Sequence, residues 1–91
     1  MAEWNVDVPA YGSDGNLNFV WDDGFQILVD RSNSEITIRA NAAGLVSLAR
    51  HCLTLAQEAV PPGSHIHLTD SVELEAGSGD LIIDKLRDWC P

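Results

Sequence analysis

Residues 35–68 read EITIRANAAGLVSLARHCLTLAQEAVPPGSHIHL and change their periodicity twice within one short stretch. Residues 35–40 alternate apolar with polar side chains, which is typical of a strand with one buried face. The following residues repeat apolar side chains at helical spacing. Pro-Pro-Gly at residues 61–63 ends that pattern, because proline lacks the amide hydrogen that a helix needs. Residues 65–69 alternate again, so the stretch predicts a strand, a helix and a strand.

The predicted helix covers about residues 42–59. Asn41 precedes it and is expected to act as the N-cap by accepting from the first free amide groups. Gly44 disfavours the helix by about 1 kcal/mol relative to alanine, and we expect it to allow a close approach to the sheet. The apolar stripe predicted to face the sheet is Leu45, Leu48, Ala49, Cys52, Leu55, Ala56 and Ala59. The opposite stripe is Ser47, Arg50, Thr54, Gln57 and Glu58.

Two more strands are predicted before residue 35. Residues 17–21 alternate, the loop Asp-Asp-Gly at residues 22–24 suits a three-residue hairpin, and residues 25–30 alternate again. Residues 32–34 form a second turn, so the three strands make a meander. The segment before them is rich in Gly, Asn and Asp and is read as an irregular arm, with a short strand at residues 4–8 as an option.

After the helix, residues 70–79 are expected to be a loop or a wide hairpin connection, and residues 80–86 the last strand. The order βββαββ predicts an α+β fold, with a mostly antiparallel sheet of about five strands and one central helix on one face. A chain of 91 residues forms one domain. Its predicted parts are the arm at 1–16, the β-meander at 17–40, the helix at 42–59 and the C-terminal strands at 65–86.

One helix covers one face of such a sheet, so the other face is left for solvent or a partner. The side chains expected to point inward are Leu17, Phe19, Phe25, Ile27, Val29, Ile36, Ile38, Ile66, Leu68, Leu81 and Ile83. Val20, Leu28 and Ile82 are apolar residues of the outward set, and a cluster of them would indicate a contact surface. The predicted partner-binding residues are Leu28, Arg39, His65, His67, Ile82 and Asp84.

The charge restricts the partners. Five basic residues stand against 14 acidic ones, which gives a formal net charge of −9. Nucleic acids and anionic membranes would be repelled, whereas a basic protein partner would be attracted. No apolar run approaches the roughly 18 residues of a membrane span, and the first residues lack the pattern of a signal peptide, so we expect a cytoplasmic protein. Cys52 and Cys90 have neither disulfide nor zinc-site spacing.

His65 and His67 are the sharpest chemical feature. Two residues apart on a strand, they project to the same side and could share a metal ion, with Asp70 or Asp84 as a third ligand. The alternative is a structural or partner-contacting role. His51 is expected to be a boundary residue on the helix. We predict no catalytic residues and no cofactor, because no nucleophile with a base and an orienting group emerges.

From residue 41 onward the chain resembles a family of bacterial immunity proteins, immunity protein 32. The resemblance is carried by Asn41, Gly44, Leu45, Leu48, Ala49 and Leu55, by the phrase GSHIHL at residues 63–68, and by LEAGSGDLII at residues 74–83. It extends over roughly residues 41–85. It implies an α+β protein that protects its bacterium by binding a cognate toxin, with His65 and His67 as motif residues of unassigned role.

Three hypotheses follow. The first is a binding protein that neutralises a toxin, with a basic toxin domain as partner. The second is a small metal-binding protein or metal-dependent enzyme that uses His65 and His67. The third is a homodimer that pairs through its exposed face.

Overall fold

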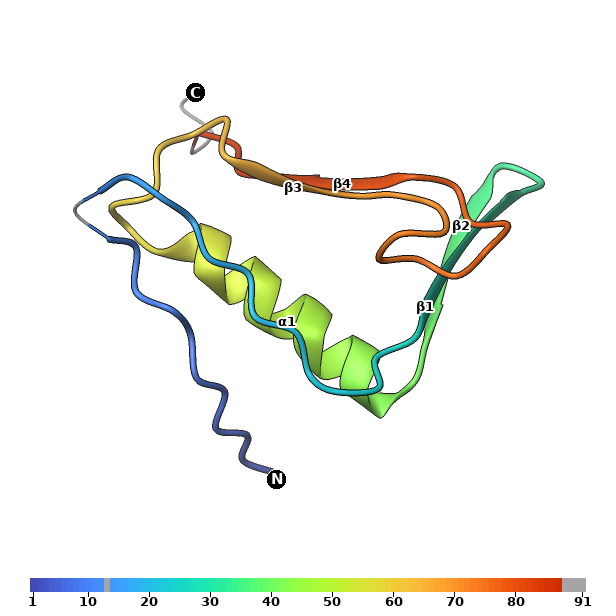
Figure 1. Ribbon diagram of the computed structural model, residues 1–91, viewed down its shortest axis with the longest axis horizontal. Coiled ribbons are helices and arrows are strands. Elements are labelled where there is room, and N and C mark those ends of the chain that lie inside the picture. The colour runs from blue at the N-terminus through green and yellow to red at the C-terminus, as the bar shows by residue number, and fades with distance from the viewer. Residues whose placement is uncertain (13, 88–91) are drawn as a thin grey trace.

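The computed structural model describes residues 1–12 and 14–87 and has the element order ββαββ (Figure 1). Its elements are β1 (Ile27–Ser32), β2 (Glu35–Ala40), α1 (Ala42–Ala56), β3 (His65–Leu68) and β4 (Leu81–Asp84). The predicted α+β class is confirmed. The predicted sheet of about five strands is corrected, because the four strands form two separate antiparallel sheets, β1-β2 and β3-β4. Cys90 lies outside the described residues.

Residues 17–21, predicted to be the first strand, join neither sheet. They run alongside α1 (Figure 1), and their backbone is bonded by helix side chains. The carbonyl of Val20 accepts from Arg50 at 3.3 Å, and the N–H of Asp22 donates to the Ser47 hydroxyl at 2.9 Å. The alternating apolar side chains of this segment still pack against the core. The alternation of apolar and polar residues at 17–21 therefore reflects the burial of one side of an extended segment, and not pairing with a neighbouring strand.

The turn between β1 and β2 consists of Asn33 and Ser34, with φ of 53° and 66°. Two successive residues with positive φ are typical of a type I′ turn, whose twist matches that of a hairpin. The register pairs Ser32 with Glu35 directly across this turn. The turn predicted at residues 32–34 is confirmed.

Asn41 caps α1 as predicted. Its Oδ1 accepts from the N–H of Gly44 at 2.8 Å and from that of Gln26 at 3.0 Å, while its Nδ2 donates to the carbonyl of Gly24 at 2.8 Å. The cap thus fixes the helix to the segment that leads into β1. A Cβ at Gly44 would lie 2.6 Å from the carbonyl oxygen of Gln26, which confirms the expected close approach. The helix ends at Ala56, three residues before the predicted boundary.

The buried face of α1 is rotated from the predicted one and overlaps it at Leu48 and Leu55. Its buried residues are Gly44, Ser47, His51, Thr54 and Leu55. Of the stripe predicted to face the sheet, Leu55 is buried and Leu48 half-buried, whereas Leu45, Ala49, Cys52, Ala56 and Ala59 are exposed. Polar residues can lie on the buried face because the hydroxyls of Ser47 and Thr54 donate within the helix, to the carbonyls of Ala43 and Arg50 at 2.8 and 2.7 Å.

The connection between β3 and β4 joins the two sheets. Its Leu74 is 3 % exposed and belongs to the core. The N–H of Glu75 donates to the carbonyl of Ile27 and that of Gly79 to the carbonyl of Val29, both at 2.8 Å. These bonds occupy the edge of β1 that faces away from β2. The connection is therefore a structural part of the core, which its loop-like composition did not indicate.

Two residues predicted to point inward are exposed. Ile36 and Ile38 are 67 % and 44 % exposed, while Ile27 and Val29 at the base of the same hairpin are buried. Ile38 lies directly opposite buried Val29, so the difference is between the two strands: the β3–β4 connection lies against the outer edge of β1, whereas β2 is the outer strand of its sheet. Ile36 lies nearer the turn, in the part of the hairpin that extends beyond α1 (Figure 1).

Candidate functional site

The outward face of β3–β4 carries most of the predicted partner-binding residues. His65 and His67 are exposed and alternate with buried residues along β3, as predicted. The register sets Asp84 opposite His65 and Ile82 opposite His67, and both are exposed. The structure therefore places these four side chains on one surface, which mixes two imidazoles, a carboxylate and an isoleucine.

Next to this face, a groove of about 440 Å³ lies between the two hairpins. It is lined by Val29, Arg31, Ile36, His67, Asp80, Leu81 and Ile82. His67 Nε2 lies 3.2 Å from a carboxylate oxygen of Asp80, whose other oxygen accepts from the N–H of Asp70 at 3.1 Å. The Asp70 amide, and then the His67 ring, hold the pKa of Asp80 below its usual value. Asp80 was predicted to begin the last strand and was not part of the predicted site. It lies just before β4, where its contacts with His67 and the Asp70 amide depend on the path of the connection.

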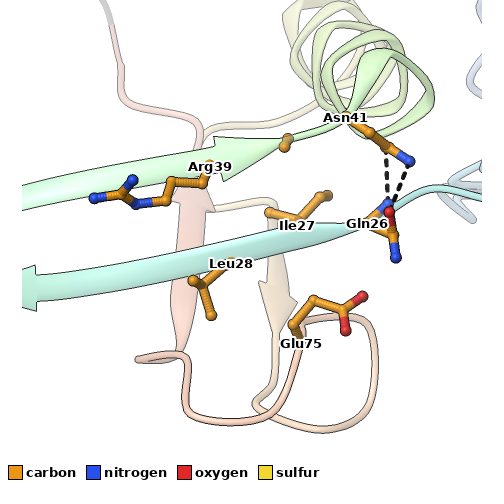
Figure 2. A pocket seen from close by; sticks show the side chains of 7 residues that line it. Gln26, Ile27, Leu28, Arg39, Asn41 and Glu75 are labelled. Carbon is orange, nitrogen blue, oxygen red and sulfur yellow. Dashed lines mark hydrogen bonds between the residues drawn. The ribbon is translucent and has the colours of Figure 1, made fainter.

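Leu28 and Arg39 lie on a different surface. They are opposite each other in the β1–β2 ladder. Both line a separate groove of about 370 Å³ (Figure 2). Glu75, the N-cap residue Asn41 and its hydrogen-bond partner Gln26 line the same groove. The predicted partner-binding set is thus divided between the two hairpins, and its larger part is on β3–β4.

The proposed metal ligands do not form a ligand set in the structure. The carboxylate of Asp70 accepts from the N–H of Gly77 and from the hydroxyl of Ser71, both at 3.0 Å, and so organises its own loop. Across residues 1–12 and 14–87, no three or more His, Cys, Asp or Glu side chains are grouped so that they could hold a metal ion. His65 and His67 share a face, and Asp84 lies opposite His65 on it, but these side chains form no such group in the described part of the chain.

His51 is fully buried. The expectation that it is a boundary residue on the helix is therefore wrong. Its ring is 4.3 Å from that of Trp21 and 5.3 Å from that of Phe19, centroid to centroid, both edge-on. Neither ring nitrogen has a hydrogen-bond partner. Burial, and secondarily the charge of Arg50, lower its pKa to about 4. The imidazole is therefore neutral near pH 7 and acts as a packing group without access to a substrate.

Residues 35–86 match the family described as Immunity protein 32. The chain belongs to the immunity protein 32 family. The resemblance predicted from the sequence is confirmed, and the match runs from β2 through the β3–β4 face. No curated protein and no solved structure matches the chain.

In this immunity protein 32 chain, several basic side chains are already bound within the fold. Arg50 forms an ion pair with Asp22 at 2.7 Å. Lys85 donates from Nζ to the carbonyls of Gln57 and Val60 at 2.7 and 2.8 Å, beyond the end of α1. The β3–β4 hairpin carries five carboxylates, Asp70, Glu73, Glu75, Asp80 and Asp84, and Arg31 of β1 lies in the adjoining groove.

The same chain has an apolar groove of about 310 Å³ between its N-terminal arm and α1. Trp4 and Val6 of the arm line it opposite Leu45 and its helix neighbours. Trp4 is 74 % and Leu45 54 % exposed. The sequence did not indicate this groove, because its helix residues were assigned to the core. None of the helical structure in residues 1–12 and 14–87 combines the length and apolar character of a membrane span.

Proposed function

We propose that this chain neutralises a cognate bacterial toxin by direct protein–protein contact, and that it does so in the cytoplasm. The family match over residues 35–86 is the observation that carries the proposal. The exposed free thiol of Cys52 fits a reducing compartment, where such thiols persist.

The surface that best fits a toxin is the outward face of β3–β4. It lies inside the matched region and carries His65, His67, Ile82 and Asp84, with Asp80 in the adjoining groove. An exposed isoleucine among polar groups supplies the apolar anchor that an interface centre needs. The surrounding carboxylates favour a basic toxin domain and would accelerate its encounter with the immunity protein.

Growth rescue tests this proposal. The product of the gene adjacent to this one would be expressed in a bacterial host, alone and together with the immunity protein. We expect growth to stop in the first case and to be restored in the second. If the neighbour is not toxic, or if co-expression gives no protection, toxin neutralisation is the wrong function.

Two matched variants locate the contact. Ile82→Asp puts a charge on the β3–β4 face, and Leu45→Asp puts the same charge on α1, at residues of similar exposure, 57 % and 54 %. We expect Ile82→Asp to weaken protection and Leu45→Asp to leave it intact. The opposite pattern would move the toxin contact to the apolar groove beside α1.

A further inference from the structure

Among residues 1–12 and 14–87, no strand and no backbone hydrogen bond occupies the edge of β2 that faces away from β1. The outward carbonyls of β1, those of Ile27 and Val29, already accept bonds from the β3–β4 connection. In an antiparallel ladder, the N–H and C=O groups of two directly opposite residues point either toward each other or both away from the ladder. Val29 lies opposite Ile38. The N–H and C=O groups of Ile38, and of Ile36 two residues before it, therefore point out of the free edge of β2.

This edge has neither a proline nor a bulge to protect it against pairing. Proteins also protect exposed edges with charged side chains, but the two charged residues of β2 have opposite signs and can pair with those of a second strand. The β2 sequence is EITIRA, and its ladder with β1 runs without interruption from residue 35 to residue 40. The side chains of Ile36 and Ile38 are largely exposed beside the free backbone groups. A regular, partly apolar edge of this kind fits another extended strand.

The β2 sequence is complementary to itself, and we propose that β2 pairs with β2 of a second copy of this chain, antiparallel about a two-fold axis at Thr37. In that register, Ile36 lies opposite Ile38 of the second copy. Glu35 lies opposite Arg39 of the second copy, and the two Thr37 side chains are neighbours. Apolar, opposite-charge and Thr–Thr pairs are all favourable across antiparallel strands.

The charges select this register. Outward-pointing residues must face each other, so a two-fold antiparallel pairing can be centred on any one residue of β2. A centre at Glu35 or Arg39 would set like charges opposite each other, and a centre at Ile36 or Ile38 would leave both charges without an opposite partner. Within the described residues of its own chain, neither Glu35 nor Arg39 has an ion-pair partner, and both are exposed.

The net charge of −9 on each copy opposes self-association at long range, but the charges at the β2 edge itself favour a second copy over a basic protein. The β2 edge carries one positive and one negative side chain, so a cationic strand would gain no net electrostatic attraction there. Two copies that each carry a net charge of −9 would meet at a segment without local net charge. Pairing would give one continuous sheet, β1-β2-β2-β1, with Ile36 and Ile38 of both copies gathered on one face.

Sedimentation velocity tests the dimer, with the purified full chain from a few micromolar to about 1 mM. The wild type is expected to dimerise with rising concentration. Glu35→Arg and Arg39→Glu, tested singly, each set like charges opposite each other and should weaken association at least about tenfold. An equimolar mixture of the two single variants should form a heterodimer, and the double variant should recover the wild-type affinity.

The recovery is diagnostic because residues 35 and 39 are about 13 Å apart along one strand and cannot pair within a chain. Glu58→Arg, at an exposed residue of another segment, changes the net charge by the same amount as Glu35→Arg and should not weaken the dimer. Circular dichroism verifies that each variant is folded. A wild type that stays monomeric, single variants that dimerise like the wild type, or a dimer that is lost only with Leu45→Asp would overturn the proposal.

Discussion

The buried imidazole of His51 makes the stability of this protein depend on pH in a defined direction. In the folded state its pKa is about 4, whereas an exposed histidine in the unfolded chain has its ordinary value of 6.5. Between these two pH values, His51 binds more protons in the unfolded chain than in the folded protein. The contribution of neutral His51 to the free energy of unfolding is therefore complete above pH 6.5 and is lost as the pH falls toward 4. From pH 7.5 to pH 5, we expect His51 to lower the free energy of unfolding by about 2 kcal/mol.

Urea denaturation at the two pH values measures this change, and His51→Leu isolates it. Leucine has a similar volume and does not titrate, so the variant should lose about 2 kcal/mol less than the wild type. It should also be at least as stable at pH 7.5, because it removes two buried nitrogens that have no hydrogen-bond partner. The charged groups near His51, Arg50 with its partner Asp22, are present in both proteins and cancel in the comparison.

Titration of the imidazole resonances by NMR gives the pKa of His51 in the folded protein directly, without a variant. The His51 ring should stay neutral in the folded protein down to about pH 5. A midpoint for His51 near 6.5 in the folded protein would refute the reasoning, as would the same pH dependence of stability in His51→Leu and the wild type.

Three further predictions follow from the cap, the helix contact and the histidine pair. Gly44→Ala should destabilise the fold by about 1–3 kcal/mol in urea denaturation, because its Cβ would meet the carbonyl of Gln26; unchanged stability would contradict this contact. Asn41→Ala should cost about 1–2 kcal/mol in the same assay, whereas Asn41→Ser, which keeps a capping hydroxyl, should recover part of it; equal losses would argue against the cap. Zinc titration by calorimetry should give the same weak heats for the wild type and for the His65→Ala, His67→Ala double variant, and strong binding by the wild type alone would restore the metal hypothesis.

Local signals in the sequence predicted the elements well. The alternation of residues 35–40, the cap at Asn41 and the turn at residues 32–34 are each determined by a few neighbouring residues, and the structure contains all three. The paired histidines on one face follow from strand geometry alone.

The orientation of α1 could not be predicted from its apolar content, because it depends on a segment far away in sequence. Residues 17–22 pack on the stripe that contains Ser47 and His51, and the hydroxyls of Ser47 and Thr54 bond inside the helix, so polar residues belong to the buried face. A signal was nevertheless present. Gly44 and Ser47 are small residues one turn apart, and such spacing indicates a face that packs closely against a neighbour.

The predicted site was divided for a similar reason. A single sheet would have set Leu28 and Arg39 beside the two histidines, but the chain forms two hairpins that are joined through the connection between β3 and β4. That connection contributes Leu74 to the core and Asp80 to the groove, and both depend on long-range contacts that its loop-like composition does not encode.

Direct binding to the neighbouring gene product is the measurement that tests toxin neutralisation most directly. Isothermal titration calorimetry of the purified immunity protein against that product, made non-toxic by a substitution in its own catalytic residues, should show saturable binding of fixed stoichiometry. Ile82→Asp should weaken that binding and Leu45→Asp should not. The absence of any binding heat, with both proteins folded, would contradict the account.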